Sequence, residues 1–173
     1  IFCSGCLINE VVQKRFFLNF PVNSRAELEK VPFEEVVLIY KKMKIPARLM
    51  IAPLDKNTEV GVLLFHGWGG SMNDWKKVQL KLYNNNISSL AFNYAHQADS
   101  TINPSFKNAF TVNDVRQISR IALDLLKQRL KKKQRIYLCG HSLGNSVMID
   151  AYNDLDKNNL SALIMCNPIS SLP

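Results

Sequence analysis

Short apolar segments alternate with amphipathic helical segments along most of this chain, and this alternation limits the folds it can adopt. Residues 60–65 form an almost wholly apolar run, which is typical of a strand buried on both faces of a parallel sheet. Two strands joined as a hairpin through 41–46 are predicted before this run, at 36–40 and 47–52. After it, helices and strands alternate, at 73–83, 87–93, 112–130, 135–139, 143–152 and 160–165. The pattern predicts an α/β fold with a mostly parallel sheet and helices on both faces.

A G-x-S-x-G motif lies between the strand predicted at 135–139 and the helix predicted at 143–152, and it reads Gly140-His141-Ser142-Leu143-Gly144. A tight strand-to-helix turn lifts a serine hydroxyl above the sheet, and flanking glycines remove the Cβ atoms that would block such a turn. The N-terminus of the following helix adds a partial positive charge. This context predicts that Ser142 is a nucleophile, and a chance match of five loosely defined positions is the alternative.

A glycine-rich loop, His66-Gly67-Trp68-Gly69-Gly70, follows the apolar run at 60–65. Glycines allow a backbone to approach a reacting group closely, because no side chain intervenes. A dinucleotide-binding loop is the rival interpretation. That loop requires G-x-G-x-x-G at the start of a helix, and this sequence lacks the third glycine at that spacing.

The two motifs, in this order and on these elements, resemble those of the α/β-hydrolase family. The resemblance implies that Ser142 attacks the substrate and that the backbone N–H groups of Trp68 and Leu143 hold the resulting oxyanion. It also implies a supporting role for the loop residues His66 and Gly67. It implies the same for Gly140, His141 and Gly144, which surround Ser142 in the turn between the strand predicted at 135–139 and the following helix. We call this turn the serine turn.

The loop resembles that of generic esterases, monoacylglycerol-lipase-like enzymes and serine aminopeptidases. The resemblance therefore implies hydrolysis of an ester, thioester or amide through an acyl-enzyme, with a small-molecule acyl ester or a peptide as substrate. No cofactor and no metal are implied.

A catalytic acid and a catalytic histidine are the parts of the family pattern that this sequence lacks. The family order is serine, acid, histidine. No histidine follows Ser142 in the sequence, and the acidic residues that do follow it are Asp150, Asp154 and Asp156. We assign none of the histidines as the base, because His66 belongs to the loop, His141 to the serine turn and His96 to a segment where no base is expected.

Both ends of the chain suggest a fragment, because it begins at Ile1 and stops at Pro173 directly after a predicted strand. We expect the acid and the base to lie beyond Pro173. The alternative is a naturally shortened, non-catalytic protein that kept the fold for binding or as a scaffold.

The chain carries a formal charge of +8, but its basic residues are mostly scattered. The dense run Lys131-Lys132-Lys133 falls at the end of a predicted helix, where cations meet the negative end of the helix dipole. A polyanion site is the alternative for this run, but no nucleic-acid-binding signature accompanies it, and we expect no nucleic-acid partner. Hydrophobic residues make up 47 % of the chain, which excludes a disordered protein.

Residues 7–34 have no consistent periodicity, and we interpret residues 1–34 as an N-terminal arm before a partial hydrolase domain at 35–173. The start of this arm, Ile1 to Cys6, resembles the end of a bacterial lipoprotein signal peptide. The resemblance implies lipidation of Cys6, membrane anchoring and a place in the cell envelope. Cys3 and Cys6 also form a C-x-x-C, a weak metal or disulfide signal, and a segment with no special role is the other alternative. Cys139 and Cys166 lie in apolar runs and are predicted to be small core residues.

Overall fold

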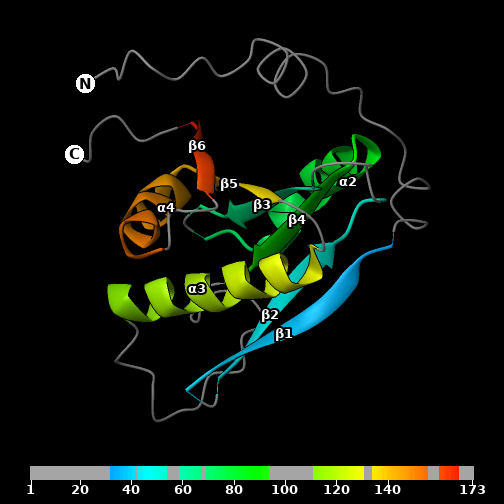
Figure 1. Ribbon diagram of the computed structural model, residues 1–173. Coiled ribbons are helices and arrows are strands. Elements are labelled where there is room, and N and C mark those ends of the chain that lie inside the picture. The colour runs from blue at the N-terminus through cyan, green and yellow to red at the C-terminus, as the bar shows by residue number, and fades with distance from the viewer. Residues whose placement is uncertain are drawn as a thin grey trace. The chain divides into compact units, whose positions relative to one another are not determined.

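The computed structural model describes residues 32–41, 43–53, 59–67, 69–93, 111–130, 134–155 and 160–167, which all belong to one compact unit spanning residues 32–173. A six-stranded sheet forms its centre (Figure 1). The strands are β1 (Glu34–Tyr40), β2 (Met43–Met50), β3 (Glu59–Phe65), β4 (Ile87–Phe92), β5 (Gln134–His141) and β6 (Leu160–Cys166). Their order across the sheet is β1-β2-β4-β3-β5-β6.

The direction of the strands confirms the mostly parallel sheet. Strand β3 pairs in parallel with both β4 and β5, and β5 pairs in parallel with β6. Strand β2 is antiparallel to both of its neighbours, β1 and β4. Because β3 and β5 are adjacent and parallel, the loops that follow them leave the same edge of the sheet.

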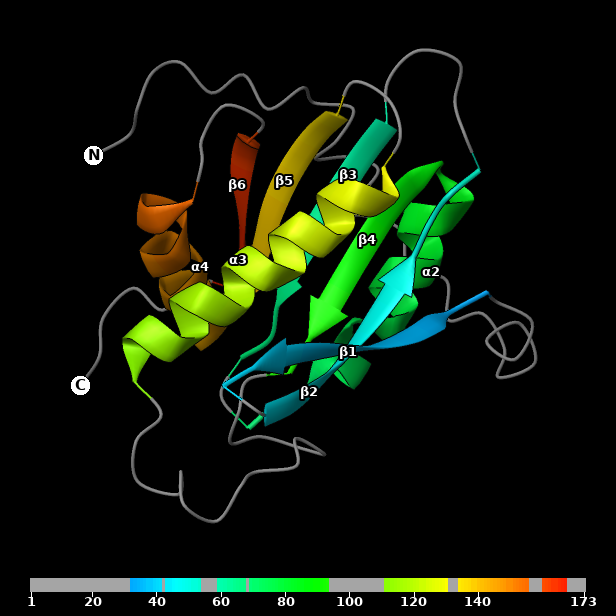
Figure 2. The ribbon, with the colours of Figure 1, turned by 60° about the horizontal axis from the view of Figure 1, so that its bottom comes forward.

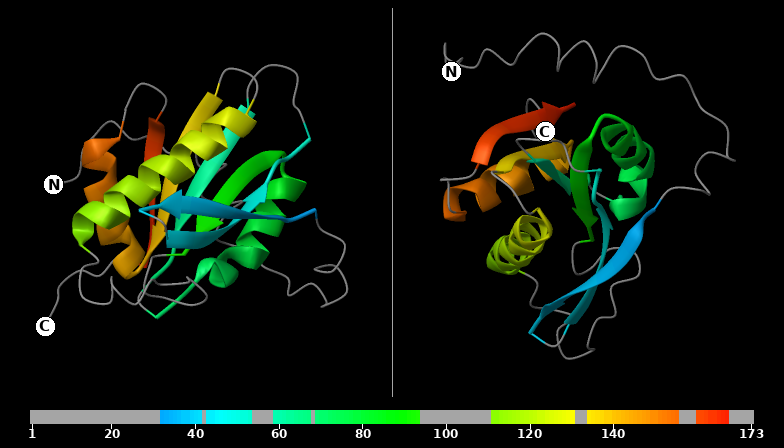
Figure 3. Two further views of the ribbon diagram at one scale, coloured as in Figure 1. Left: turned by 90° about the horizontal axis from the view of Figure 1, so that it is seen from below. Right: turned by 45° about the vertical axis from the view of Figure 1, so that its right-hand side comes forward.

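Helices cover both faces of this sheet, as predicted (Figure 2). A short 3₁₀ turn, η2 (Met72–Trp75), runs directly into α2 (Lys76–Asn84), and this unit lies on one face. Helices α3 (Val112–Arg129) and α4 (Leu143–Asp154) lie on the opposite face, which the right-hand view of Figure 3 shows with the sheet nearly edge-on. None of the helices in the described ranges is long and apolar enough to cross a bilayer.

Strand β3 is buried on both faces, which explains its almost wholly apolar sequence. Leu63 and Phe65 belong to the core cluster under α3 and α4. Val62 and Leu64 alternate with them, so they face the side of α2, and they are equally buried. The two hydrophobic layers fix β3, and with it the point where the glycine-rich loop begins.

The connection between β1 and β2 is shorter than the predicted one at 41–46. Strand β2 begins at Met43, which pairs with Tyr40, so Pro46 lies inside the strand. Proline lacks an N–H and usually interrupts a ladder. Here the Pro46 carbonyl accepts the Asn93 N–H at 3.0 Å, just past the end of β4, so only one bond at the end of the ladder is missing.

Candidate active site

Ser142 forms the turn between β5 and α4 by itself, in an unusual backbone conformation. Strand β5 ends at His141 and α4 begins at Leu143, and the angles of Ser142 are φ 53° and ψ −122°. L-residues rarely adopt this region, and holding one there costs about 1–3 kcal/mol. Such strain persists only where the surrounding structure imposes it. Ser142 is also partly exposed.

The glycines of the motif allow the turn to close against its surroundings. A Cβ on Gly140 would lie 2.7 Å from the Gly144 carbonyl oxygen and 2.8 Å from Asn145 Cα. A Cβ on Gly144 would lie 2.5 Å from the carbonyl oxygen of His66 and would also clash with that of Phe65. All these neighbours are backbone atoms, which cannot move aside. Gly140 therefore lets the end of β5 approach the first turn of α4, and Gly144 lets that turn pack directly on the end of β3.

Hydrogen bonds to β6 hold the turn in place. The Ser142 N–H donates to the Cys166 carbonyl oxygen at 3.0 Å, and the Asn145 N–H donates to the Ser142 carbonyl oxygen at 3.0 Å. The Asn145 side-chain amide donates to both of these oxygens, at 2.9 Å and 3.0 Å. Neither Asn145 nor the Cys166 carbonyl was predicted from the sequence. The sequence signal for Asn145 is its position: an asparagine directly after the G-x-S-x-G motif, on the first turn of a helix, can hydrogen-bond nearby backbone groups through its side-chain amide.

The glycine-rich loop meets this turn at the edge of the sheet. Phe65, the last residue of β3, pairs with Gly140 in β5. A Cβ on Gly67 would lie 3.3 Å from Ser142 Cβ and 3.3 Å from His141 Nδ1, so any larger residue at this position would crowd the serine. The structure thus brings together Ser142, Gly67 and His141, which the two sequence motifs placed separately.

His66 is buried beneath the loop, with only 1 % of its surface exposed. Its Nδ1 lies 2.9 Å from the Gly67 carbonyl oxygen, which can only accept, so Nδ1 carries the proton. Burial lowers the pKa of His66 below its ordinary value, and the bond to Gly67 opposes this only in part. A neutral imidazole bonded to the loop backbone fits the supporting role implied for His66.

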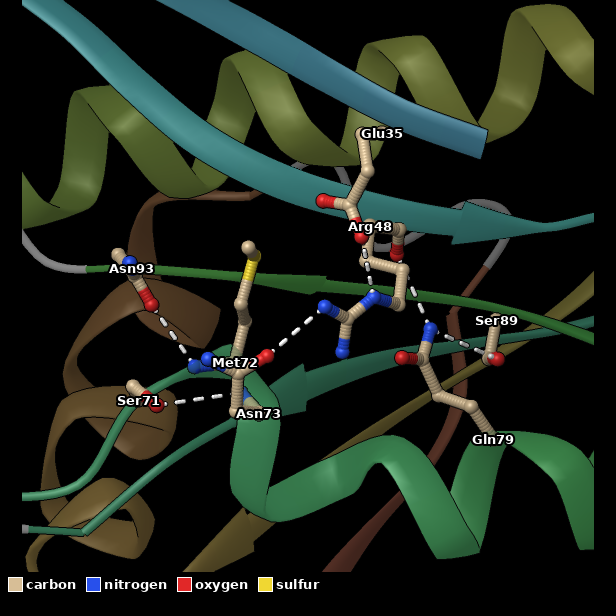
Figure 4. A network of polar contacts seen from close by, with 8 residues as sticks. All are labelled: Glu35, Arg48, Ser71, Met72, Asn73, Gln79, Ser89 and Asn93. Atoms are coloured by element: carbon tan, nitrogen blue, oxygen red, sulfur yellow. Dashed lines mark hydrogen bonds and ion pairs between the residues drawn. The ribbon is translucent and has the colours of Figure 1, made fainter. Parts of the chain in front are cut away.

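The segment after the loop is tied to β4 by a buried contact (Figure 4). The Asn93 side-chain oxygen, directly after β4, accepts the Met72 N–H at 2.7 Å. Ser71 caps the same turn, because its hydroxyl accepts the Asn73 N–H at 3.2 Å while Asp74 accepts the Ser71 N–H at 3.0 Å. These contacts fix the far end of the loop that begins at His66.

A buried arginine extends this anchoring to β1 and β2. Arg48 donates to Asn73 Oδ1 at 2.8 Å and to Glu35 Oε1 at 2.7 Å (Figure 4). From α2, the Gln79 amide donates to the Arg48 carbonyl oxygen and to the Ser89 hydroxyl. The η2–α2 unit that follows the loop is therefore held by polar contacts to β2 and β4, and Arg48 links it indirectly to β1.

The Asp150 carboxylate forms an ion pair that joins α4 to α3. Its two oxygens accept from Arg116 of α3 at 2.8 Å and 2.5 Å. Asp150 lies within α4, inside the helix predicted at 143–152, and its carboxylate is occupied by Arg116. Within the described ranges, no cluster of three or more His, Cys, Asp and Glu residues could hold a metal ion.

Several predicted residues lie outside the described part of the chain. These are Trp68, His96, Asp156, Lys131 to Lys133, Cys3 and Cys6. The oxyanion role of Trp68 and lipidation of Cys6 remain predictions. Leu143 is described as the first residue of α4, and the N–H groups of a first helical turn have no partner within the helix.

Three solved structures illustrate the similarity of the fold. A soluble variant of monoglyceride lipase from Saccharomyces cerevisiae, in complex with a substrate analog, matches with a TM-score of 0.66 at 17 % identity, over 84 % of this chain and 48 % of the lipase. An esterase from Pyrococcus furiosus matches with a TM-score of 0.60 at 16 % identity, over 87 % of this chain and 54 % of the esterase. A Vigna radiata epoxide hydrolase mutant matches with a TM-score of 0.61 at 16 % identity, over 78 % and 38 % respectively.

These identities show a shared fold and nothing about activity. The chain spans between 38 % and 54 % of the lengths of these three proteins. No curated protein sequence matches the chain. The family described as "Alpha/beta hydrolase of unknown function (DUF1057)" matches residues 41–171, which include the glycine-rich loop, the serine turn and every strand from β2 to β6. The chain therefore belongs to this family of α/β hydrolases.

Proposed function

We propose that the protein is a serine hydrolase that cleaves an ester, thioester or amide through an acyl-enzyme on Ser142. The observation that carries the proposal is the strained backbone of Ser142 at a turn held by β6 and packed against Gly67. Strain of this kind is concentrated at functional sites. A merely structural serine at a strand–helix junction gains nothing from it.

The reaction would begin when Ser142 Oγ attacks the acyl carbon and the carbonyl oxygen becomes an oxyanion. The N–H of Leu143 would donate one hydrogen bond to this oxyanion and the N–H of Trp68 another. The N-terminus of α4 starts at this point, so its partial positive charge favours the same developing negative charge. Gly67 has no side chain, and a Cβ there would lie 3.3 Å from Ser142 Cβ, so the loop backbone can approach the serine closely.

A base must take the proton from Ser142, because a serine hydroxyl is a poor nucleophile without one. We assign this role to a histidine, oriented by an acid, which the family order places after the nucleophile. His66 does not suit the role, because its Nδ1 is bonded to Gly67 and it is buried under the loop.

The names of the similar structures guide the choice of the first substrate to test. The similar structures include a monoglyceride lipase and an esterase, and both names describe enzymes that act on acyl compounds. A small acyl ester is therefore the first substrate to test, and a peptide or aminoacyl amide is the second.

The decisive experiment uses the full-length protein with its Ser142→Ala variant. A fluorophosphonate should label the wild type at Ser142, and p-nitrophenyl esters of increasing acyl length should be hydrolysed. We expect Ser142→Ala to abolish labelling and to lower kcat/KM by about 10³-fold or more. Peptide mass mapping locates the label.

The matched control is Ser146→Ala, which alters an exposed serine one turn further along α4 and should leave both readouts unchanged. Full hydrolysis by Ser142→Ala would overturn the proposal. A full-length wild type that neither reacts with the probe nor cleaves any ester, thioester or amide would favour the second candidate, a non-catalytic binding or scaffold protein.

A further inference from the structure

We propose that Cys139 and Cys166 form a reversible dithiol–disulfide pair that controls the serine turn, and the control of activity rests on the function proposed above. The two Sγ atoms lie 3.8 Å apart, and both cysteines are free thiols. Cys139 lies on β5, three residues before Ser142, and Cys166 ends β6. They share one face of the sheet, because His141 pairs with Cys166 and lies two residues from Cys139.

The two thiols have different surroundings, which suggests different roles. Cys139 is 1 % exposed, whereas Cys166 is half-buried and open to a small oxidant. The hydrogen bond from the Cys139 thiol lowers the pKa of Cys166, although partial burial opposes this. The same contact, together with burial, raises the pKa of Cys139. Because the thiolate is the reactive form, Cys166 attacks first and Cys139 completes the bond.

The oxidant in this step is a hydroperoxide, with hydrogen peroxide as the simplest case. The Cys166 sulfur attacks one peroxide oxygen, an S–O bond forms, the O–O bond breaks, and water leaves after taking up a proton. The Cys139 sulfur then attacks the Cys166 sulfenic sulfur, the S–S bond forms, the S–O bond breaks, and the Cys139 proton leaves in a second water. Two thiols and one peroxide thus give one disulfide and two waters. The sulfurs together lose the two electrons that the peroxide gains.

The consequence for Ser142 comes from the backbone of Cys166. Its carbonyl oxygen accepts the Ser142 N–H and the Asn145 amide, both at 3.0 Å. A disulfide requires the sulfurs to approach to about 2.05 Å, which is much shorter than their present separation. Closing that gap draws the end of β6 toward Cys139 and displaces the carbonyl that holds the turn. The turn cannot follow freely, because Gly140 and Gly144 are packed against backbone atoms.

The first test maps the bond without reference to activity. The full-length protein is treated with hydrogen peroxide, free thiols are blocked with N-ethylmaleimide, and the protein is digested with trypsin without reduction. Cleavage after Arg135 and Lys157 places Cys139 and Cys166 on separate peptides. We expect a cross-linked pair of these peptides that disappears with dithiothreitol. In Cys139→Ala, we expect a dimedone adduct at Cys166 instead, because the sulfenic acid is not resolved.

The second test measures the rate of fluorophosphonate labelling at Ser142. Peroxide should slow labelling of the wild type by about tenfold or more, because small misplacements of a nucleophile are costly. Dithiothreitol should restore the rate, and Cys166→Ala should not respond to peroxide. If the reduced wild type is not labelled at all, the proposed function fails. The peptide mapping alone then decides whether the disulfide forms. Absence of both the cross-link and the Cys166 adduct overturns the inference, and a cross-link without slower labelling overturns the control of Ser142.

Discussion

The backbone of Ser142 is the residue-scale feature with the clearest energetic consequence. Its φ of 53° with ψ −122° is strained for serine and ordinary for glycine. We expect the free energy of unfolding of Ser142→Gly to be about 1 kcal/mol higher than that of Ser142→Ala. Glycine relieves the backbone strain, and this gain exceeds the stability lost because glycine has more conformational entropy in the unfolded chain. Urea denaturation of both variants measures this difference. Equal stabilities would show that the turn is not strained.

Asn145 is a positioning residue at the same scale, since its amide bridges the carbonyl oxygens of Ser142 and Cys166. Asn145→Asp keeps the shape but replaces a donor with an acceptor that both oxygens repel. We expect Ser142 labelling to slow by about tenfold near pH 8 and to recover partly near pH 5, where the introduced carboxyl can be protonated and donate again.

The matched control for this variant is Asn153→Asp, which changes an exposed residue on the same helix. It introduces the same charge without touching the turn, so its labelling rate should follow the wild type at every pH. A slower rate for Asn145→Asp without any recovery at low pH would argue against a role for the donated hydrogen bonds.

At the scale of elements, the start of α3 is joined to the β1–β2 hairpin through Asp114. Burial alone would raise the pKa of this carboxyl, but hydrogen bonds from Lys41, Thr111 and Tyr40 hold it well below its usual range. A carboxyl with a lowered pKa in the folded state stabilises the protein above its unfolded pKa of about 4. That stabilisation is lost as the pH falls further.

We therefore expect Asp114→Asn to lower the free energy of unfolding at pH 7 by about 2 kcal/mol. The difference from the wild type should shrink as the pH is lowered from about 5 to 2. Asp124→Asn, an exposed change on the same helix, should cost about 0.5 kcal/mol or less. A pH-independent difference for Asp114→Asn would mean that packing, and not the carboxylate, joins α3 to the hairpin.

The contact between Asn93 and Met72 links β4 to the loop beside Ser142. Asn93→Leu leaves the buried Met72 N–H without its acceptor, at a cost of about 1–3 kcal/mol, and frees the end of the loop. Because that loop would hold the oxyanion, kcat should fall by about tenfold while KM changes little. Asn93→Asp retains an acceptor and should keep most of kcat. Equal losses in both variants would limit Asn93 to a general role in stability.

At the scale of the whole molecule, periodicity and motif context were enough to predict the fold class. Buried parallel strands have a distinct apolar pattern, and Gly140 and Gly144 are required by the turn between β5 and α4. The contacts that hold the turn were not predictable, because the Cys166 carbonyl is a backbone group without a sequence signature. Arg48 was equally unpredictable. A charged residue in a strand normally faces solvent, and its burial depends on Glu35 and Asn73 arriving from two other elements.

The bond from Ser142 to Cys166 joins the turn to a strand that comes later in the chain. During synthesis, β5 and the first turn of α4 leave the ribosome before β6 does. A nascent chain at that stage lacks the acceptor that keeps Ser142 in its strained conformation, so the serine can relax. The conformation of Ser142 is therefore completed by residues translated after it, once β6 has paired with β5.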